Sequence, residues 1–245
     1  MQNILKISGA LLCFLLILNG KVSHAQNNET LLGSADSLFE SGKYTSALKE
    51  YNLLLDKKKI YTPQMLLRMA YIHEADGDYT EALYFLNMYY GHTADRRVMQ
   101  KMSDIANKHQ LSGYKFTDYE YFGSVFHRNY MLFMVIGSII GVALLALVFY
   151  KKHKGEPYLP AAISLALLMV VFLWLFNFGF NDQKAIVRTE HAFVADAPSA
   201  GAKRLYKLEK GERVDIKAVN DIWYKVSPSN DKEVFVRKNN LIVVE

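Results

Sequence analysis

Two long uncharged apolar runs lie back to back in the middle of this chain. Tyr130 to Tyr150 is 21 residues without a charged side chain, and Leu159 to Phe180 is 22. A helix rises about 1.5 Å per residue, so each run is long enough to cross the hydrocarbon core of a bilayer, which is about 30 Å thick. We therefore expect a two-helix transmembrane hairpin, with helices at residues 130–150 and 158–180.

The loop between the two runs indicates the orientation of the hairpin. Residues 151–157 read KKHKGEP, with three lysines against the single acid Glu156. Short basic loops are retained on the cytoplasmic side of a membrane. The loop is therefore expected in the cytoplasm, and the regions before and after the hairpin on the opposite side.

The N-terminus has the pattern of a signal peptide over residues 1–25. Lys6 precedes an apolar core, Ile7 to Leu18, and Ser23-His24-Ala25 offers small residues at a cleavage position. An uncleaved anchor is the alternative, although the core is short for a membrane span. The only cysteine, Cys13, lies inside this segment, so the mature chain would have neither a disulfide nor a cysteine metal site.

The charge of the soluble regions argues against nucleic acid as a partner. The whole chain has a formal charge of +5, but residues 26–128 carry −1 and residues 181–245 carry +2. Proteins that bind nucleic acid usually present a strongly basic surface. Neither soluble region has that excess of basic side chains.

An internal repeat marks residues 26–112 as a helical domain. SGKYTSALKEY (41–51) recurs as DGDYTEALYFL (76–86), at an offset of 35 residues. Glycine allows a tight turn between two helices, and alanine allows the helices to approach closely. The spacing resembles the tetratricopeptide repeat, whose period is about 34 residues. A further amphipathic helix, predicted within residues 94–111, would cap the stack.

The resemblance to tetratricopeptide domains implies a peptide-binding concave face on the first helix of each repeat. The positions that map to this face are Leu32, Asp36, Phe39, Leu67, Tyr71 and Glu74. Leu32, Phe39 and Leu67 could equally be packing residues. The lysine and asparagine set that clamps a terminal carboxylate in chaperone-binding relatives is missing, so that ligand is not expected.

An aromatic segment, residues 113–129, separates the helical domain from the first apolar run. It contains seven rings if the adjoining tyrosine is included: Tyr114, Phe116, Tyr119, Tyr121, Phe122, Phe126 and Tyr130. Such rings favour the headgroup layer of a membrane, which predicts an interfacial segment. Alternatively, the rings pack on the last helix of the repeat domain.

The two apolar runs contain no Asp, Glu, Lys, Arg or His. Ion and proton pathways need such groups, so a transporter or channel is not favoured. Gly137 and Gly141 form a Gly-x-x-x-Gly pattern typical of close helix packing. From their depth we expect alanines to make the contact inside the hairpin and the two glycines to pack on another protein or a second copy, unless the pattern is fortuitous.

The C-terminal region, residues 184–245, changes to short alternating runs typical of strands. Five strands are predicted, at 185–187, 212–219, 223–226, 233–236 and 241–244, which suits a small all-β barrel. The order of Lys210-Gly211-Glu212, Trp223-Tyr224 and Val234-Phe235-Val236 resembles bacterial SH3 domains. The resemblance implies a ligand groove with Trp223, Tyr224 and Phe235 as candidates. Val234 and Phe235 replace the usual Gly-Trp pair, and Trp223 could instead be a core residue.

Catalytic motifs are missing from the sequence. It has no Gly-x-Ser-x-Gly elbow and no glycine-rich phosphate loop, and its seven histidines are scattered. We therefore expect no catalytic residues, no metal and no cofactor, and a protein that is not an enzyme.

The complete order of segments resembles the BatE-type component of the Bacteroidetes aerotolerance (Bat) operons. That resemblance implies a multi-pass protein of the bacterial inner membrane with both soluble domains in the periplasm. It also implies an envelope complex with von Willebrand A-type Bat proteins and a MoxR-type ATPase. The first hypothesis is a non-enzymatic scaffold or adaptor that assembles such a complex, active in aerotolerance or stress. The alternative is an envelope sensor that binds peptidoglycan through the SH3-like domain.

Overall fold

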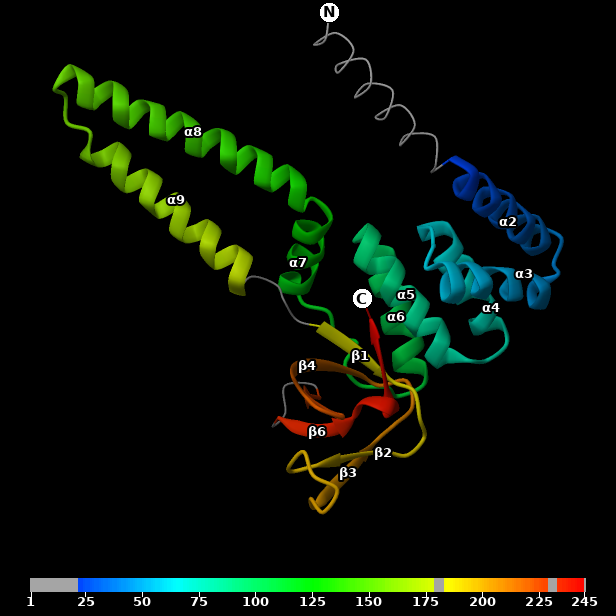
Figure 1. Ribbon diagram of the computed structural model, residues 1–245. Coiled ribbons are helices and arrows are strands. Elements are labelled where there is room, and N and C mark those ends of the chain that lie inside the picture. The colour runs from blue at the N-terminus through cyan, green and yellow to red at the C-terminus, as the bar shows by residue number, and fades with distance from the viewer. Residues whose placement is uncertain (1–21, 179–182, 229–232, 245) are drawn as a thin grey trace, which may run out of the picture. The chain divides into compact units, whose positions relative to one another are not determined.

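The computed structural model describes residues 22–178, 183–228 and 233–244, and it is mostly helical with a C-terminal antiparallel sheet. The predicted signal peptide lies mainly outside the described residues, apart from the end of its range, where α2 begins. The chain forms two compact units, one up to Asp76 and one from Gly77 onward. The α-helices in the described part are α2 (Val22–Glu40), α3 (Tyr44–Asn52), α4 (Pro63–Ala75), α5 (Tyr79–Thr93), α6 (Arg96–Lys108), α7 (Asp118–Arg128), α8 (Tyr130–Lys154) and α9 (Leu159–Phe178) (Figure 1).

The first unit consists of α2, α3 and α4, with a π-helical turn, Leu53–Lys57, after α3. Thr62 caps the start of α4 by accepting a hydrogen bond from the Met65 N–H at 3.2 Å, and Pro63 suits the first helical position. The core of this unit includes the following fully buried side chains: Ala35, Ala47, Tyr51, Leu54, Met65, Leu66 and Met69. Small alanines on α2 and α3 allow these two helices to pack closely.

The helix boundaries follow the internal repeat. The turn between α2 and α3 spans residues 41–43, and the turn between α4 and α5 spans residues 76–78, so the offset of 35 residues is kept. Gly42 and Gly77 have φ angles of +75° and +80°. An L-residue with a Cβ rarely adopts this conformation, which explains why glycine stands at both turns.

Helices α5, α6 and α7 open the second unit. The predicted helix within residues 94–111 is confirmed as α6, which buries Val98, Met102, Ile105 and Ala106. Helix α7 was not predicted, because its aromatic residues were interpreted as a membrane-interface segment. Thr117 caps α7 by accepting a hydrogen bond from the Glu120 N–H at 3.3 Å.

Most rings of the aromatic segment for which contacts are defined lie against protein. Tyr114 is buried, Phe116 lies 4.4 Å beneath the Arg213 guanidinium, and Tyr121 lies 4.0 Å beneath that of Arg96 on α6. Tyr119 and Phe122 are exposed. The alternative expectation, packing on the last predicted repeat helix, therefore applies to Tyr121. The ring centre of Phe116 also lies 6.0 Å from that of Tyr90 on α5, so this alternative applies to Phe116 in part. Tyr114 and Phe116 pack against Arg213 of the sheet as well, which neither expectation included.

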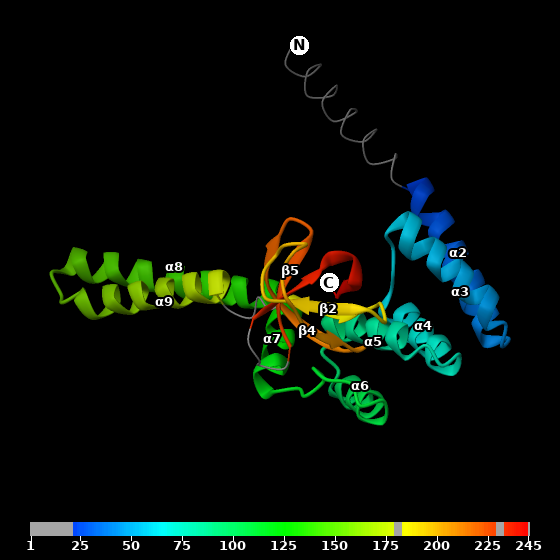
Figure 2. The ribbon, with the colours of Figure 1, turned by 90° about the horizontal axis from the view of Figure 1, so that it is seen from below.

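Helices α8 and α9 run side by side (Figures 1 and 2). Within the described residues, α8 is the one helix that is long and apolar enough to cross a membrane, and the described apolar part of α9 is shorter, Leu159–Leu175. Helix α8 continues through Lys154, so most of the predicted basic loop forms the last turn of this helix. The second membrane span therefore remains a prediction.

The glycine pair does not face outward as expected. Gly137 is buried, and a Cβ added there would overlap the ring of Phe172 on α9, while a Cβ at Gly141 would lie 3.9 Å from Leu168. The expectation that these glycines are available to another protein is therefore wrong for Gly137. The bulky Phe172 side chain needs a position without a side chain opposite it, and Gly137 provides that position.

The C-terminal sheet has seven antiparallel strands in the order β3-β2-β6-β5-β4-β1-β7. The strands are β1 (Gln183–Val187), β2 (Ala192–Ala195), β3 (Arg204–Leu208), β4 (Arg213–Asn220), β5 (Trp223–Ser227), β6 (Val234–Arg237) and β7 (Leu241–Val244). The five predicted strands are confirmed, with boundaries that differ by at most two residues. Strands β2 and β3 were not predicted.

The sheet is not closed into a barrel, so the predicted barrel is wrong. Strands β3 and β7 form its two edges and do not pair with each other. Only Leu208 of β3 is buried, and the other four residues of this strand are exposed. Strand β3 therefore buries one side chain only and adds little to the core of the sheet. The core of the sheet is formed by alternating side chains such as Val187, Val194, Val226 and Val236.

Candidate functional site

Three of the six residues predicted for the concave face meet around Arg68, within the first unit. Asp36 and Phe39 come from α2, and Tyr71 comes from α4, one turn beyond Arg68. The Arg68 guanidinium lies 2.5 Å from the Asp36 carboxylate and 5.0 Å from the centre of the Phe39 ring. Arg68 was not predicted as a site residue, although the helical spacing of Gln64, Arg68 and Tyr71 could have identified it.

A hydrogen-bonded network fixes the position of Arg68. The Tyr51 hydroxyl donates to Asp36 at 2.6 Å, and Arg68 Nη2 pairs with Glu40 at 3.0 Å. Burial, together with donation to Asp36, raises the pKa of Tyr51 to about 12. The hydrogen bond to Tyr51 raises the pKa of Arg68 above its ordinary value, so the guanidinium remains charged. Helices α2, α3 and α4 therefore share one charged cluster.

Phe39, which lies against this guanidinium, belongs to a cluster of three aromatic rings. The ring centres of Phe39 and Tyr44 are 5.4 Å apart, and Tyr71 lies 5.8 Å from each of them. Tyr71 is 52% exposed, and Tyr44 and Leu67 are also exposed. We call Phe39, Tyr44, Leu67, Arg68 and Tyr71 the Arg68 patch. Tyr44 was not predicted as a site residue, but it contributes to this surface.

The remaining predicted positions lie farther along the same helices. Leu32 is two turns before Phe39 on α2 and is half-buried, and Glu74 is one turn after Tyr71 on α4 and is also half-buried. Rigid aromatic rings around an ordered arginine are typical of binding hot spots, so the geometry favours the Arg68 patch as the active part of this face.

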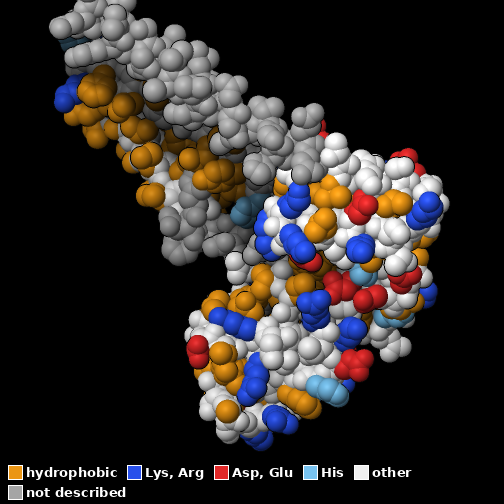
Figure 3. Space-filling view, turned by 45° about the vertical axis from the view of Figure 1, so that its right-hand side comes forward, with side chains coloured by type: hydrophobic (Ala, Val, Ile, Leu, Met, Phe, Trp, Pro, Cys, Tyr) orange, Lys and Arg blue, Asp and Glu red, His pale blue; other side chains and the backbone are white. Residues whose placement is uncertain are grey.

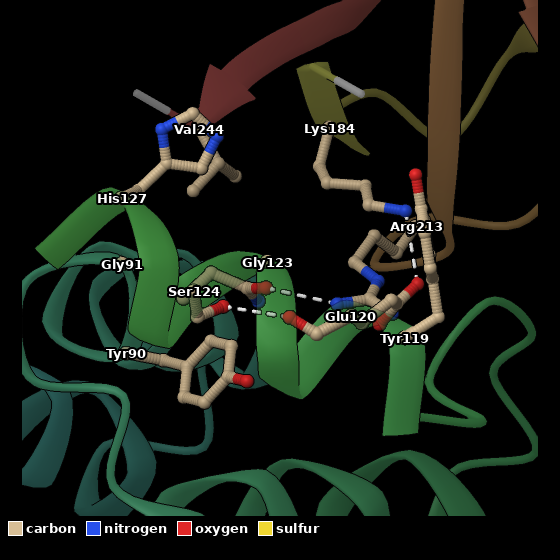
Figure 4. A pocket seen from close by; sticks show the side chains of 11 residues that line it. Tyr90, Gly91, Tyr119, Glu120, Gly123, Ser124, His127, Lys184, Arg213 and Val244 are labelled. Atoms are coloured by element: carbon tan, nitrogen blue, oxygen red, sulfur yellow. Dashed lines mark hydrogen bonds and ion pairs between the residues drawn. The ribbon is translucent and has the colours of Figure 1, made fainter. Parts of the chain in front are cut away.

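The second unit contains a cavity of about 200 Å³ between helices α5 and α7 and the sheet. Figure 4 shows side chains from both sides converging on it, with Tyr90 from α5, Glu120 and His127 from α7, Lys184 from β1 and Arg213 from β4. No sequence pattern indicated this cavity, because its residues are separated by up to 157 positions, from Asn87 to Val244.

The charges in the cavity balance one another. Glu120 pairs with Lys184 at 2.9 Å and with Arg213 at 3.3 Å, and Lys184 also pairs with Asp215 at 2.6 Å. Arg213 is only 4% exposed, and its Nε donates to the Gly113 carbonyl oxygen at 2.7 Å. Both cations that line the cavity are therefore already paired with carboxylates. The cluster therefore fastens the helices to the sheet.

Tyr90 is the one group of this cavity whose side-chain hydrogen bonding is incomplete among the described residues. Its buried hydroxyl has no hydrogen-bond partner. Burial raises the pKa of Tyr90, and the nearby Ser124 opposes part of that rise. A cavity of this size has room for water molecules, which would satisfy the hydroxyl.

A second set of contacts continues the attachment of the helices to the sheet. The Tyr114 hydroxyl donates to the Gly211 carbonyl oxygen at 2.8 Å, and Ser112 Oγ donates to Glu212 at the same distance. Burial raises the pKa of Tyr114, so this hydroxyl stays protonated and can donate. The loop before α7 and the start of β4 therefore form one buried junction.

The predicted groove residues of the sheet do not form a single site. Tyr224 packs against the sheet core with Val226 and Val236, whereas Trp223 and Phe235 lie on the other face because neighbouring strand residues alternate. Trp223 is largely buried and lines a separate cavity of about 260 Å³, without Tyr224 or Phe235. The groove of three aromatic residues is therefore not formed.

No group of three or more His, Cys, Asp or Glu side chains that could hold a metal ion occurs in residues 22–178, 183–228 and 233–244. No family model, curated protein or solved structure matches the chain.

Proposed function

We propose that this chain is a membrane-anchored adaptor that binds a protein partner through the Arg68 patch. The observation that carries the proposal is the exposed, preorganised ring cluster around Arg68. The guanidinium is already paired with Asp36 and Glu40, so the patch offers mainly apolar and aromatic surface. It suits a partner segment with an apolar or aromatic side chain that can insert beside Tyr71.

The surface of the α8–α9 pair supports the membrane anchor. Met131, Val142 and Phe149 on α8 are between 64% and 75% exposed, and Leu159 and Leu173 on α9 are similarly exposed. Figure 3 shows apolar side chains along this pair where they are in view. Large apolar surfaces of this kind are unfavourable in water but favourable in hydrocarbon. Lysines at the end of α8 would hold the connection between the helices in the cytoplasm.

The repeated helix boundaries and the glycines at both turns support a tetratricopeptide-like helical region. In the proposed topology this region and an SH3-like sheet share the periplasmic side of a bacterial inner membrane. The BatE-type resemblance makes von Willebrand A-type Bat proteins, with their MoxR-type ATPase, the proposed complex. The proposed role is assembly of that complex in aerotolerance or envelope stress, without turnover of a substrate.

A photo-crosslinking experiment in native membranes tests the adaptor. The full chain carries a photo-reactive amino acid at position 67, one turn from Tyr71, and adducts are identified by mass spectrometry. We expect a discrete adduct with an envelope protein, strongly reduced by Tyr71→Ala. The control is Ile60→Ala, which removes an exposed apolar side chain outside the patch. No adduct, or one that Tyr71→Ala leaves unchanged, would refute the proposal.

A second candidate function is an envelope sensor that binds peptidoglycan through the sheet. The polar cavity beside Trp223 favours this possibility. Co-sedimentation of the full chain with purified peptidoglycan tests it, with Tyr71→Ala as a control that should have no effect. If the chain stays in the supernatant, the sensor proposal is removed and the adaptor proposal is unaffected.

A further inference from the structure

The cavity beside Trp223 is lined mainly by polar and basic groups. It lies where β2, β3, β5 and β6 come together with the turn after β2 and the short 3₁₀ helix Lys238–Asn240. Its side chains include Arg204, Arg237, His191, Ser199, Asn239 and Asn240, and no carboxylate from the described residues lines it. Residues 229–232, which include Asp231, lie outside the described chain. The described lining therefore carries positive charge and hydrogen-bond donors.

Both arginines are held in place by aromatic rings. The Arg204 guanidinium lies 5.0 Å from the centre of the Phe193 ring, and that of Arg237 lies 5.4 Å from the centre of the Trp223 ring. Trp223 and Arg237 are direct cross-strand neighbours on β5 and β6. A guanidinium that rests on a ring has fewer conformations to lose when it binds a ligand.

The arginines also differ from other basic residues of the protein in how their charge is compensated. Arg68, Arg213 and Lys184 are each paired with two carboxylates or with one carboxylate and a carbonyl oxygen. Arg204 and Arg237 make no ion pair with any carboxylate of the described residues. Asp196, which follows the lining residue Ala195, accepts a hydrogen bond from the Lys203 N–H at 3.1 Å.

We infer that this cavity binds an oxyanion, a carboxylate or a phosphate, carried at the end of a larger ligand. The planar guanidinium fork matches the oxygens of both groups, and the neighbouring Asn and Ser side chains can add hydrogen bonds. A volume of about 260 Å³ is small for an entire drug-sized ligand but sufficient for one terminal group. The inference is independent of the adaptor and does not require that the ligand be peptidoglycan.

The test uses the full chain in detergent and follows the fluorescence of Trp223. The chain has two tryptophans, so Trp174→Phe leaves Trp223 as the single reporter. Inorganic phosphate and N-acetylglycine are the two probes, and sodium chloride at matched ionic strength is the salt control. We expect a saturable change with at least one probe and none with chloride. The probe that saturates distinguishes a phosphate ligand from a carboxylate ligand.

Substitutions then assign the binding to the two arginines. Arg204→Gln and Arg237→Gln should each weaken binding by about tenfold, since a hydrogen bond to a charged group contributes about this factor. Lys217→Gln, which removes an equal charge from β4 outside the cavity, should leave the affinity unchanged. Calorimetric titration gives the affinity of Arg237→Gln even if loss of the guanidinium alters Trp223 emission.

Two results would overturn the inference. One is a response to both probes that does not saturate or that equals the response to chloride. The other is an affinity that neither arginine substitution lowers. Tyr71→Ala should bind both probes normally, so failure here and failure of the adaptor are distinguishable. Arg204 and Arg237 are exposed, so their substitution removes no side chain from the core of the sheet, and circular dichroism of the same samples checks the fold.

Discussion

Replacing Arg213 with methionine should loosen the attachment of the sheet to helices α5 and α7. Methionine keeps much of the volume of the side chain, but it cannot pair with Glu120 or donate to the Gly113 carbonyl oxygen and Asn87. Glu120 retains Lys184, so the carboxylate is not left alone. Removing one member of a buried ion pair costs about 3–5 kcal/mol, and the partial exposure of Glu120 places our expectation near the lower end, about 3 kcal/mol.

Arg188→Met provides a matched control. Arg188 also joins the sheet to the helices, through a contact of 3.2 Å between its Nε and Glu81, but its side chain is 59% exposed. An exposed ion pair contributes about 0–1 kcal/mol. Unfolding in denaturant, followed by Trp223 fluorescence in the Trp174→Phe background, measures both variants. The reasoning is refuted if the two substitutions reduce the free energy of unfolding equally, or if Arg213→Met costs less than about 1 kcal/mol.

Three further predictions concern the helices. Gly137→Ala should lower the midpoint of thermal unfolding in detergent, because the added Cβ overlaps the Phe172 ring. Adding Phe172→Leu to this variant should restore part of the loss. An unchanged midpoint in both variants would contradict this contact. The pKa of Tyr51 is raised in the folded state, so folding favours the protonated hydroxyl. The stability that this shift contributes is complete below about pH 10 and is lost as the pH rises through about 12. Denaturant titrations followed by circular dichroism give the free energy of unfolding at each pH. The difference in this free energy between wild type and Tyr51→Phe should shrink over that pH range, and a constant difference would exclude Tyr51 as the source. In a Cys13→Ser background, His153→Cys should not react with an impermeant thiol reagent added to spheroplasts, whereas Ser37→Cys should react. The reverse pattern would show that the proposed topology is inverted.

The local features of the fold could be predicted from the sequence. The glycine turns, the capping helix α6 and five strands follow from patterns that extend over a few residues. Strands β2 and β3 did not, because β2 is only four residues long and β3 places four of its five side chains in solvent. Neither strand has the clear alternation of buried and exposed residues by which a half-buried strand is predicted.

The contacts between distant segments could not be predicted in this way. Tyr114 and Phe116 were interpreted as membrane-interface rings, because the arginine that covers them follows about 100 residues later in the chain. The same limit applies to the Arg68 patch. Resemblance to a repeat family selected Asp36, Phe39 and Tyr71. The residue that contacts both Asp36 and Phe39 is Arg68, and this role can be recognised only when α2 and α4 are seen packed together.

The ion pair between Lys184 and Glu120 has a mechanical consequence. Helix α7 runs into α8 through the single residue Asn129, and Lys184 stands at the start of the strand that follows α9. The pair thus ties the first turn of the helix that precedes α8 to the strand that follows α9. In the proposed membrane-anchored topology, a tilt of α8 relative to α9 would therefore act on this ion pair.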